Sequence, residues 1–325
     1  MRRSLTSIAL ACCAFTPAFA AVSGVVINGS TDKPQPNVIV SLVQPSQSGM
    51  QNLGSAKTDA DGKFHIDKQT QGPQLVQALY GGVLYNKMVF PGAPSSAVRV
   101  DVFDSTIKPD VAKVAQHFIV LQPSPSEMTV SEGILYNVEA KLTYNDPING
   151  SFRFYLPPEA NGKVSVTINA PGGMPIQRPA QKTKEANVYK VDYPIKPGET
   201  RFDLNYTVPA ANPQTFSSKI LHSEGTSDLV IPNGVTIKGA DIELAGQEPK
   251  TQANIYRIKN ASFKVEVEGT GSLQQPETAQ PEEDNGMPGI QQVKPRIYER
   301  MYWILGMAFA ILGLGSVLLY RSTAK

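Results

Sequence analysis

The run Asp59-Ala60-Asp61-Gly62 has the spacing with which calcium-binding loops begin, because alternate carboxylates can supply oxygen ligands to the ion. Such a loop also needs a bidentate acid further along the chain, and Thr70 stands at that place. The same residues suit a tight turn, since Asp side chains can accept hydrogen bonds from nearby amides and glycine tolerates a positive φ. The sequence therefore predicts that Asp59, Asp61 and Gly62 form a structural turn between two strands.

Two other short motifs suggest catalysis but lack the residues that would complete them. His222-Ser223-Glu224 has the His-x-Glu spacing of zinc deaminases, yet the cysteines that those enzymes use as further ligands do not follow it. Ser105 and Lys108 match the Ser-x-x-Lys motif of penicillin-recognising enzymes, but neither companion motif of those enzymes occurs. We therefore predict no catalytic residue, no cofactor, no metal site and no enzymatic activity.

The counts of charged residues, cysteines and histidines exclude several classes of protein. The 325 residues include 30 Lys and Arg against 28 Asp and Glu, and without Arg2 and Arg3 the balance is 28 against 28. No basic excess exists to neutralise phosphates, so nucleic acid is not an expected partner. Cys12 and Cys13 are the two cysteines, and they leave no disulfide framework. The chain has three histidines, which we expect to be surface or hydrogen-bonded structural groups: His65, His117 and His222.

The first twenty residues have the features of a secretory signal peptide. Two arginines precede an apolar stretch, and small residues stand at Ala18 and Ala20. Signal peptidase selects small residues at these two positions, so we expect cleavage before Ala21. Residues 1–20 are therefore predicted to be removed on export, together with both cysteines.

A second apolar segment lies near the C-terminus. Residues 301–320 carry no charge, and about twenty such residues span the hydrocarbon of a membrane. Tyr302 and Trp303 stand at one edge and Tyr320 at the other, as interfacial aromatic residues do. We predict one transmembrane helix, with an exported head before it and a cytoplasmic tail at 321–325. Its small residues either form a helix-packing stripe or reflect the usual composition of membrane helices: Gly306, Ala310 and Gly313.

Residues 21–104 consist of short β-type runs separated by turns. The expected strands are 24–28, 37–43, 53–58, 63–67, 74–80, 83–89 and 98–103. Seven short strands in this span predict a small antiparallel β-sandwich. Three blocks in this order, 24–26, 34–42 and 58–64, resemble the carboxypeptidase regulatory-like domain family. That resemblance implies a transthyretin-like or carbohydrate-binding-like β-sandwich with no catalytic residues, and it does not imply peptidase activity.

Residues 113–270 are also rich in strand patterns, and no segment keeps the apolar period of a helix. Ten candidate strands in this span predict a second, larger antiparallel β-sandwich: 117–121, 134–144, 152–156, 163–168, 188–193, 201–208, 219–222, 236–244, 254–259 and 262–268. Residues 271–296 are rich in Gln, Pro and Glu and cannot bury enough apolar surface to repay ordering, so we expect a disordered tether.

Export, anchoring, two sandwiches and incomplete catalytic motifs together favour a binding or structural role. We expect a single-pass protein of the bacterial inner membrane, with a periplasmic or extracellular head that contacts another envelope protein through its β-sandwich modules. Two alternatives stay open. One is a carbohydrate-binding module protein with a glycan as partner, and the other is an envelope hydrolase whose site is assembled in the second sandwich.

Overall fold

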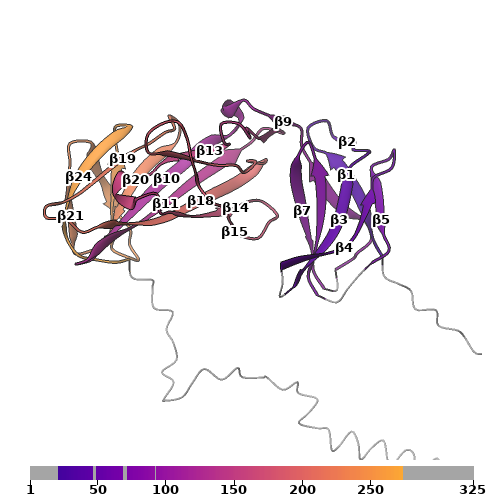
Figure 1. Ribbon diagram of the computed structural model, residues 1–325, viewed down its shortest axis with the longest axis horizontal. Coiled ribbons are helices and arrows are strands. Elements are labelled where there is room, and N and C mark those ends of the chain that lie inside the picture. The colour runs from indigo at the N-terminus through magenta and orange to yellow at the C-terminus, as the bar shows by residue number, and fades with distance from the viewer. Residues whose placement is uncertain (1–20, 47–48, 69–71, 92, 274–325) are drawn as a thin grey trace, which may run out of the picture. The chain divides into compact units, whose positions relative to one another are not determined.

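The computed structural model describes residues 21–46, 49–68, 72–91 and 93–273, and all of these belong to one compact unit. The chain in these ranges is almost entirely β-structure, as Figure 1 shows, and this confirms the predicted all-β class. Within the same ranges, the helices are two short 3-10 turns, η1 (Pro109–Val111) and η2 (Pro158–Ala160). No helix among these residues is both long enough and apolar enough to cross a membrane.

Two four-stranded sheets share one apolar core and form the first sandwich. One sheet contains β1 (Val22–Asn28), β2 (Lys33–Pro34), β5 (Lys63–Ile66) and β8 (Val98–Val102). The other has the order β4 (Gly49–Lys57), β3 (Ile39–Ser46), β6 (Gln74–Tyr80) and β7 (Val83–Val89). Buried side chains from both sheets meet in the core, among them Val26, Val40, Leu42, Val76 and Val100.

Strand β8 shows why this sequence forms a half-buried sheet. Val98, Val100 and Val102 are buried, whereas Arg99 and Asp101 between them are exposed and form an ion pair at 2.8 Å. Alternate residues of a strand point to opposite faces, so a strict alternation of valine and charge gives one dry face and one wet face.

Most strand pairs are antiparallel, as predicted, but each sandwich also contains a parallel pair. Strand β8 pairs in parallel with β1, placing Gly24 opposite Val98. A Cβ atom at Gly24 would lie 1.9 Å from the Val98 carbonyl oxygen, so glycine permits this close approach. Alternation along a strand is the same for both pairing directions, which is why the sequence pattern did not reveal the parallel pair.

An eight-stranded sheet and two three-stranded sheets build a second core, and we call this part the second sandwich. The large sheet has the order β15 (Ile176–Gln177), β14 (Ser165–Asn169), β18 (Gly198–Pro209), β11 (Glu127–Val138), β10 (Lys113–Pro123), β20 (Thr226–Ile231), β23 (Asn254–Ile258) and β22 (Ile242–Gln247). The small sheets are β13 (Phe152–Tyr155), β17 (Val188–Val191) and β16 (Gln181–Lys182), and β19 (Gln214–Lys219), β24 (Ser262–Gly269) and β21 (Val235–Lys238).

The core of the second sandwich contains a stack of aromatic rings. The Phe202 ring on β18 lies 4.0 Å from the Phe152 ring on β13, centroid to centroid, and the two planes differ by 14°. Tyr136 and Tyr193 approach the same ring edge-on, at 5.7 and 6.3 Å. Phe202 therefore joins the eight-stranded sheet to the small sheet β13–β17–β16.

Several strand boundaries of the second sandwich differ from the predicted ones. Strand β20 lies in a span for which no strand was predicted, and it pairs in parallel with β10. The predicted strand 219–222 begins where β19 ends, and residues 220–222 belong to a loop. The predicted strand 134–144 is divided between β11 and the short strand β12 (Thr143–Tyr144).

A short polar junction connects the segments on either side of residue 107. Strand β9 (Ser105–Thr106) pairs in parallel with β12, so the Ser-x-x-Lys pattern begins on a strand instead of a helix. The Tyr85 hydroxyl lies 2.9 Å from the Phe103 carbonyl oxygen and 2.8 Å from Thr143 Oγ1. Lys196 Nζ donates to the Leu84 carbonyl oxygen at 2.5 Å and lies 5.1 Å from the centroid of the Tyr85 ring.

The stability of the fold is expected to rise with pH through Lys196. Burial lowers the pKa of the Lys196 ammonium from 10.5 to about 8, so between these values the unfolded chain binds the proton and the folded chain does not. The wild type should therefore gain on the order of 3 kcal/mol of unfolding free energy relative to Lys196→Met as pH rises across that interval. Urea unfolding of both proteins at several pH values measures the difference, and a flat difference curve would contradict this prediction.

Candidate functional site

The predicted turn residues join β4 to β5 in the first sandwich. Asp59 Oδ1 accepts hydrogen bonds from the backbone amides of Asp61, at 2.9 Å, and Lys63, at 2.8 Å. Gly62 has a φ of +72°, and a Cβ atom there would lie 2.7 Å from the Val26 carbonyl oxygen. The Asp59 carboxylate thus binds the amides of its own turn.

The other predicted site residues concern export and anchoring. Ala21 is the first described residue, whereas Ala18 and Ala20 lie outside the described ranges. The residues of the predicted membrane anchor also lie outside them: Tyr302, Trp303, Gly306, Ala310, Gly313 and Tyr320.

A buried acid–histidine chain crosses the core face of the eight-stranded sheet. Along β11, Val130 and Ile134 are buried on this face, and Glu132 occupies the position between them, only 4% exposed. His117 on β10 and Tyr206 on β18 flank Glu132 and are 5% and 4% exposed. Neighbouring strands of one sheet therefore bring together three polar side chains that lie far apart in sequence.

Four contacts connect this chain from the interior towards the surface. Glu132 Oε1 accepts a hydrogen bond from the Tyr206 hydroxyl at 2.5 Å, and Oε2 lies 3.0 Å from His117 Nε2. His117 Nδ1 lies 3.1 Å from His222 Nε2, and His222 Nδ1 lies 2.7 Å from the backbone oxygen of Glu224. We use the name acid–histidine chain for Tyr206, Glu132, His117 and His222.

Burial shifts the pKa values at the two ends of the acid–histidine chain in opposite directions. Burial and then the nearby Glu132 raise the pKa of Tyr206 well above its usual value, so its hydroxyl keeps the proton that it donates. Burial lowers the pKa of His222, although the hydrogen bond with the Glu224 carbonyl opposes that shift. The end of the chain at Tyr206 is therefore a fixed donor, and burial favours a neutral imidazole at the other end.

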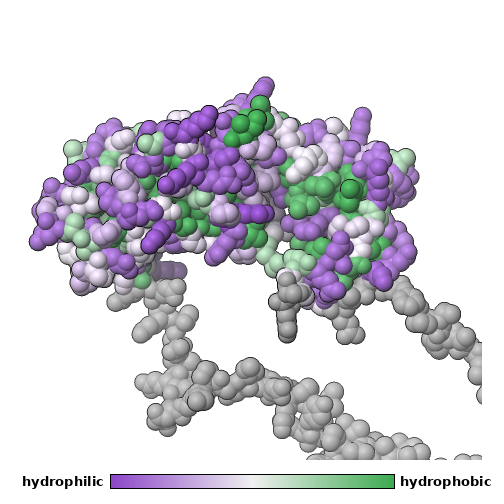
Figure 2. All heavy atoms as spheres, viewed as in Figure 1, coloured by the Kyte–Doolittle hydropathy of each residue, from purple (hydrophilic) through white to green (hydrophobic). Residues whose placement is uncertain are grey.

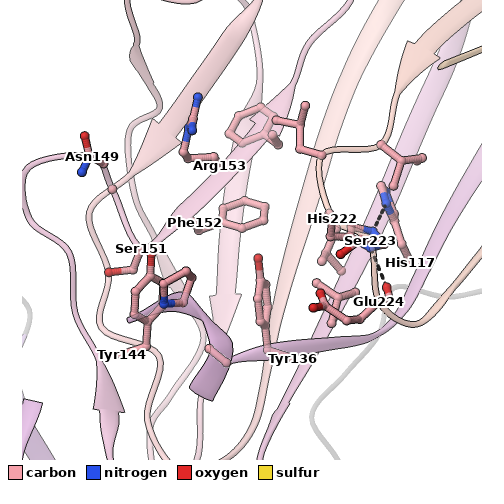
Figure 3. A pocket seen from close by; sticks show the side chains of 18 of the residues that line it. His117, Tyr136, Tyr144, Asn149, Ser151, Phe152, Arg153, His222, Ser223 and Glu224 are labelled. Atoms are coloured by element: carbon pink, nitrogen blue, oxygen red, sulfur yellow. Dashed lines mark hydrogen bonds between the residues drawn. The ribbon is translucent and has the colours of Figure 1, made fainter. Parts of the chain in front are cut away.

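A pocket of about 780 Å³ opens beside the acid–histidine chain (Figure 3). His117, Glu132 and His222 contribute to its wall. The Tyr136 ring lies between the two histidines and Tyr144, with its hydroxyl directed towards Phe152 (Figure 3). Burial raises the pKa of the Tyr136 hydroxyl, so this group is a neutral donor and acceptor inside the pocket. The pocket thus combines an aromatic surface with a pair of imidazoles.

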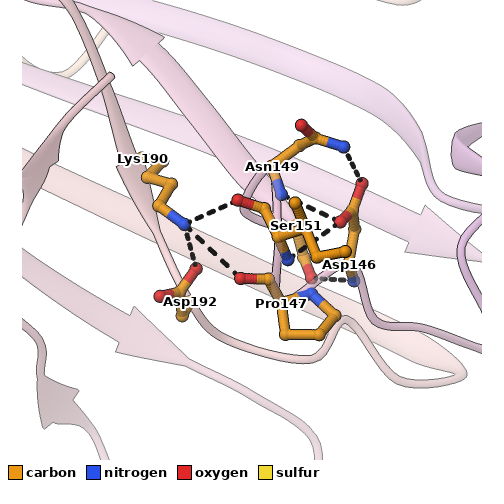
Figure 4. Close-up of polar contacts among 7 residues, drawn as sticks. Asp146, Pro147, Asn149, Ser151, Lys190 and Asp192 are labelled. Atoms are coloured by element: carbon orange, nitrogen blue, oxygen red, sulfur yellow. Dashed lines mark hydrogen bonds and ion pairs between the residues drawn. The ribbon is translucent and has the colours of Figure 1, made fainter. Parts of the chain in front are cut away.

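The loop between β12 and β13 forms part of the pocket rim and is held by polar contacts (Figure 4). The Asp146 carboxylate accepts hydrogen bonds from the amides of Ile148, at 3.1 Å, and Asn149, at 2.9 Å. The hydrogen bonds from Asn149 lower the pKa of Asp146. Lys190 Nζ donates to the Ile148 carbonyl oxygen at 2.9 Å and lies 3.3 Å from Asp192. Asp146 and Lys190 therefore hold this loop of the rim in one conformation.

The outward face of the sheet β4–β3–β6–β7 carries a second candidate site. Ile39, Leu79 and Leu84 are 51%, 42% and 48% exposed, and each lies opposite the next across neighbouring strands. We call these three residues the exposed row. Figure 2 shows apolar residues gathering among hydrophilic ones on the surface of the first sandwich. Single exposed apolar residues are ordinary on protein surfaces, whereas an aligned group of large apolar side chains indicates a surface that binds another molecule.

The acid–histidine chain is not predictable from the strand patterns, although one signal for it is present in the sequence. In the run Met128, Val130, Glu132 and Ile134, the alternate positions are apolar except for Glu132. A charged residue at a core-facing position needs a buried partner, so this break in the pattern indicates a polar site. The identity of the partners depends on strand order, and that could not be deduced from alternation alone.

Comparison with known proteins gives no family for this chain. No family model matches it, and no curated protein matches it. The similar solved structures include two chains of an M1 zinc metallopeptidase from Deinococcus radiodurans, one of them a mutant bound to a Tyr-Ser-Ala substrate. Their identities to this chain are 12% and 10%, with TM-scores of 0.26 and 0.24. Each alignment covers 48% of this chain and 42% of the peptidase chain, so the similarity is partial and too weak to indicate a function.

Proposed function

We propose that this protein is an exported, membrane-anchored and non-catalytic binding or structural protein of the bacterial cell envelope. It acts through protein–protein contacts of its β-sandwich modules. The observation that carries this proposal is the exposed row formed by Ile39, Leu79 and Leu84 on the first sandwich.

The exposed row has the arrangement that an interface needs. Its three side chains belong to three neighbouring strands, β3, β6 and β7, so they present one continuous apolar strip instead of separate points. Removing such a strip from water stabilises a complex by roughly 25 cal/mol for each Å² of apolar surface that is buried. The opposite face of the same sheet packs against the core of the first sandwich, so the exposed row lies on the face that a partner protein can contact.

The sequence supports the location of this activity. Residues 1–20 have the features of an export signal and residues 301–320 those of a membrane anchor, with a polar segment before the anchor. A partner with an apolar surface patch in the same envelope compartment could then bind the first sandwich.

Site-specific photo-crosslinking of the full chain in native membranes tests this proposal. A photo-reactive residue in place of Leu84 should capture one defined envelope protein, and the same residue in place of Leu244 on β22 should not. Leu244 is a matched control because it is an exposed leucine, at 60%, on the second sandwich.

Variants of the exposed row provide the quantitative part of the test. Ile39→Ser combined with Leu79→Ser should lower the crosslinking yield at Leu84 by at least about tenfold, since burying each large apolar side chain contributes about 1.5–3 kcal/mol. Leu244→Ser should leave the yield unchanged. An equal yield in the double variant would contradict the proposal, as would hydrolysis by the purified protein or specific binding to a glycan array.

A further inference from the structure

The two imidazoles of the acid–histidine chain face each other with one ring nitrogen each. His117 Nδ1 and His222 Nε2 are 3.1 Å apart, and the ring centroids are 5.3 Å apart with the planes 47° from each other. The outer nitrogen of each ring already has a partner, the Glu132 carboxylate for His117 and the Glu224 backbone oxygen for His222. These outer contacts hold each ring with its inner nitrogen directed towards the other ring.

The outer partners decide which nitrogens carry hydrogen. A backbone carbonyl only accepts, so His222 Nδ1 must donate to the Glu224 oxygen. With Glu132 as a carboxylate that receives the Tyr206 hydroxyl on its other oxygen, His117 Nε2 is also a donor. The two inner nitrogens are then lone-pair acceptors that face each other at 3.1 Å. Two lone pairs repel at this distance, and a shared proton or a metal ion between the two nitrogens removes that repulsion.

We propose that His117 Nδ1 and His222 Nε2 form a two-histidine site for copper or zinc, with Glu132 and the Glu224 carbonyl as the outer partners that orient the rings. Histidine ligands of metals usually donate their other ring N–H to a carboxylate or a backbone carbonyl, and here each histidine has one of these two. Neutral imidazole is a preferred ligand for both metals.

The distance between the inner nitrogens agrees with coordination of one ion. Two nitrogens at about 2.0–2.1 Å from a tetrahedral metal lie about 3.3 Å from each other. The observed 3.1 Å requires only a small opening of the pair. That opening can take place at His222, which is only partly buried and belongs to a loop, while His117 is fixed on β10.

The remaining coordination positions face the pocket. Both histidines line it, so water and ions reach the pair from the open side. The described residues contain no group of three or more His, Cys, Asp or Glu side chains that could hold a metal. The ion would therefore keep open positions for water or for a donor atom of a bound molecule, unlike a structural zinc site with four protein ligands.

The experiment measures binding of Cu(II) and of Zn(II) to the full chain after treatment with a chelator. We expect one equivalent of bound metal and, for Cu(II), an electron paramagnetic resonance spectrum with hyperfine coupling to two imidazole nitrogens. His222→Ala should weaken the affinity at least about tenfold and leave coupling to one imidazole, by comparison with the 10–100-fold losses seen when metal sites lose even an outer partner.

Two further variants keep the result interpretable. His222→Gln removes the ring but retains a polar side chain, and it should bind as weakly as His222→Ala while unfolding at the same urea concentration as the wild type. His65→Ala is the matched control, because His65 is an exposed histidine with Asp67 only 2.7 Å away, and it should retain full affinity. Absence of one-equivalent binding in the wild type would show that a shared proton alone joins the two rings. Loss of binding in His65→Ala would place the metal in the first sandwich, and either outcome overturns the proposal.

Discussion

Replacing Glu132 by leucine is expected to destabilise the metal-free protein by about 2–6 kcal/mol, because each of two buried donors left without an acceptor costs about 1–3 kcal/mol. Leucine fills a similar volume at this core position but leaves the Tyr206 hydroxyl and His117 Nε2 without their acceptor. Both groups are almost fully buried, so the loss of their acceptor leaves two buried donors unsatisfied. Urea unfolding, followed by the fluorescence of the aromatic core, measures the loss.

The control for this substitution lies on the same strand. Glu127→Leu changes an exposed glutamate of β11 and should shift the unfolding free energy by no more than about 0.5 kcal/mol. A combined variant, Glu132→Leu with His117→Leu and Tyr206→Phe, should be more stable than Glu132→Leu alone, because no buried donor is then left without a partner. If Glu132→Leu were as stable as Glu127→Leu, Glu132 would not be paired in the way described.

Replacing Phe202 by alanine should cost about 3–5 kcal/mol, the usual range for a fully buried phenylalanine. The substitution removes the ring that stacks on Phe152 and contacts the edges of Tyr136 and Tyr193, and it leaves a cavity between two sheets. Thermal and urea unfolding both measure this loss.

Phe202→Leu should cost less than Phe202→Ala, since it keeps most of the buried volume. Phe90→Ala serves as the control because Phe90 is 63% exposed, and it should change stability by about 0.5 kcal/mol or less. Equal effects at Phe90 and Phe202 would contradict the arrangement of the aromatic core.

The strands of the first sandwich could be predicted from local patterns. Strands β6 and β7 have the predicted bounds, because their apolar alternation ends at clear turn residues such as Gly81 and Gly82. Strand β20 in the second sandwich was not predicted, because its first half, Thr226-Ser227-Asp228, is polar and its apolar run is only three residues long. Asp228 is buried there and pairs with Arg257 on β23, a compensation that only the folded sheet supplies.

The acid–histidine chain needed information that no local pattern contains. His117 and Glu132 meet because β10 and β11 pair in one particular register, which is unbroken from Gln116 to Pro123. A shift of one residue in a strand moves every following side chain to the other face of the sheet. The partners of Glu132 therefore depend on strand order and register, which alternation does not encode, while Glu132 itself stands out as a charge in an apolar series.

The parallel pairs also determine the order in which the sheets can be completed during synthesis. Strand β10 lies between β11 and β20, and its Gln116 pairs with Thr226, which is made far later than β11. In the first sandwich, β1 likewise lacks its parallel partner until β8 has been synthesised. Until those later strands exist, one backbone edge of β1 and one of β10 remain unpaired, and open edges of this kind bind other strands, including those of neighbouring chains. The nascent protein therefore carries an aggregation risk that the finished sheets remove, and its many distant pairings favour slow folding.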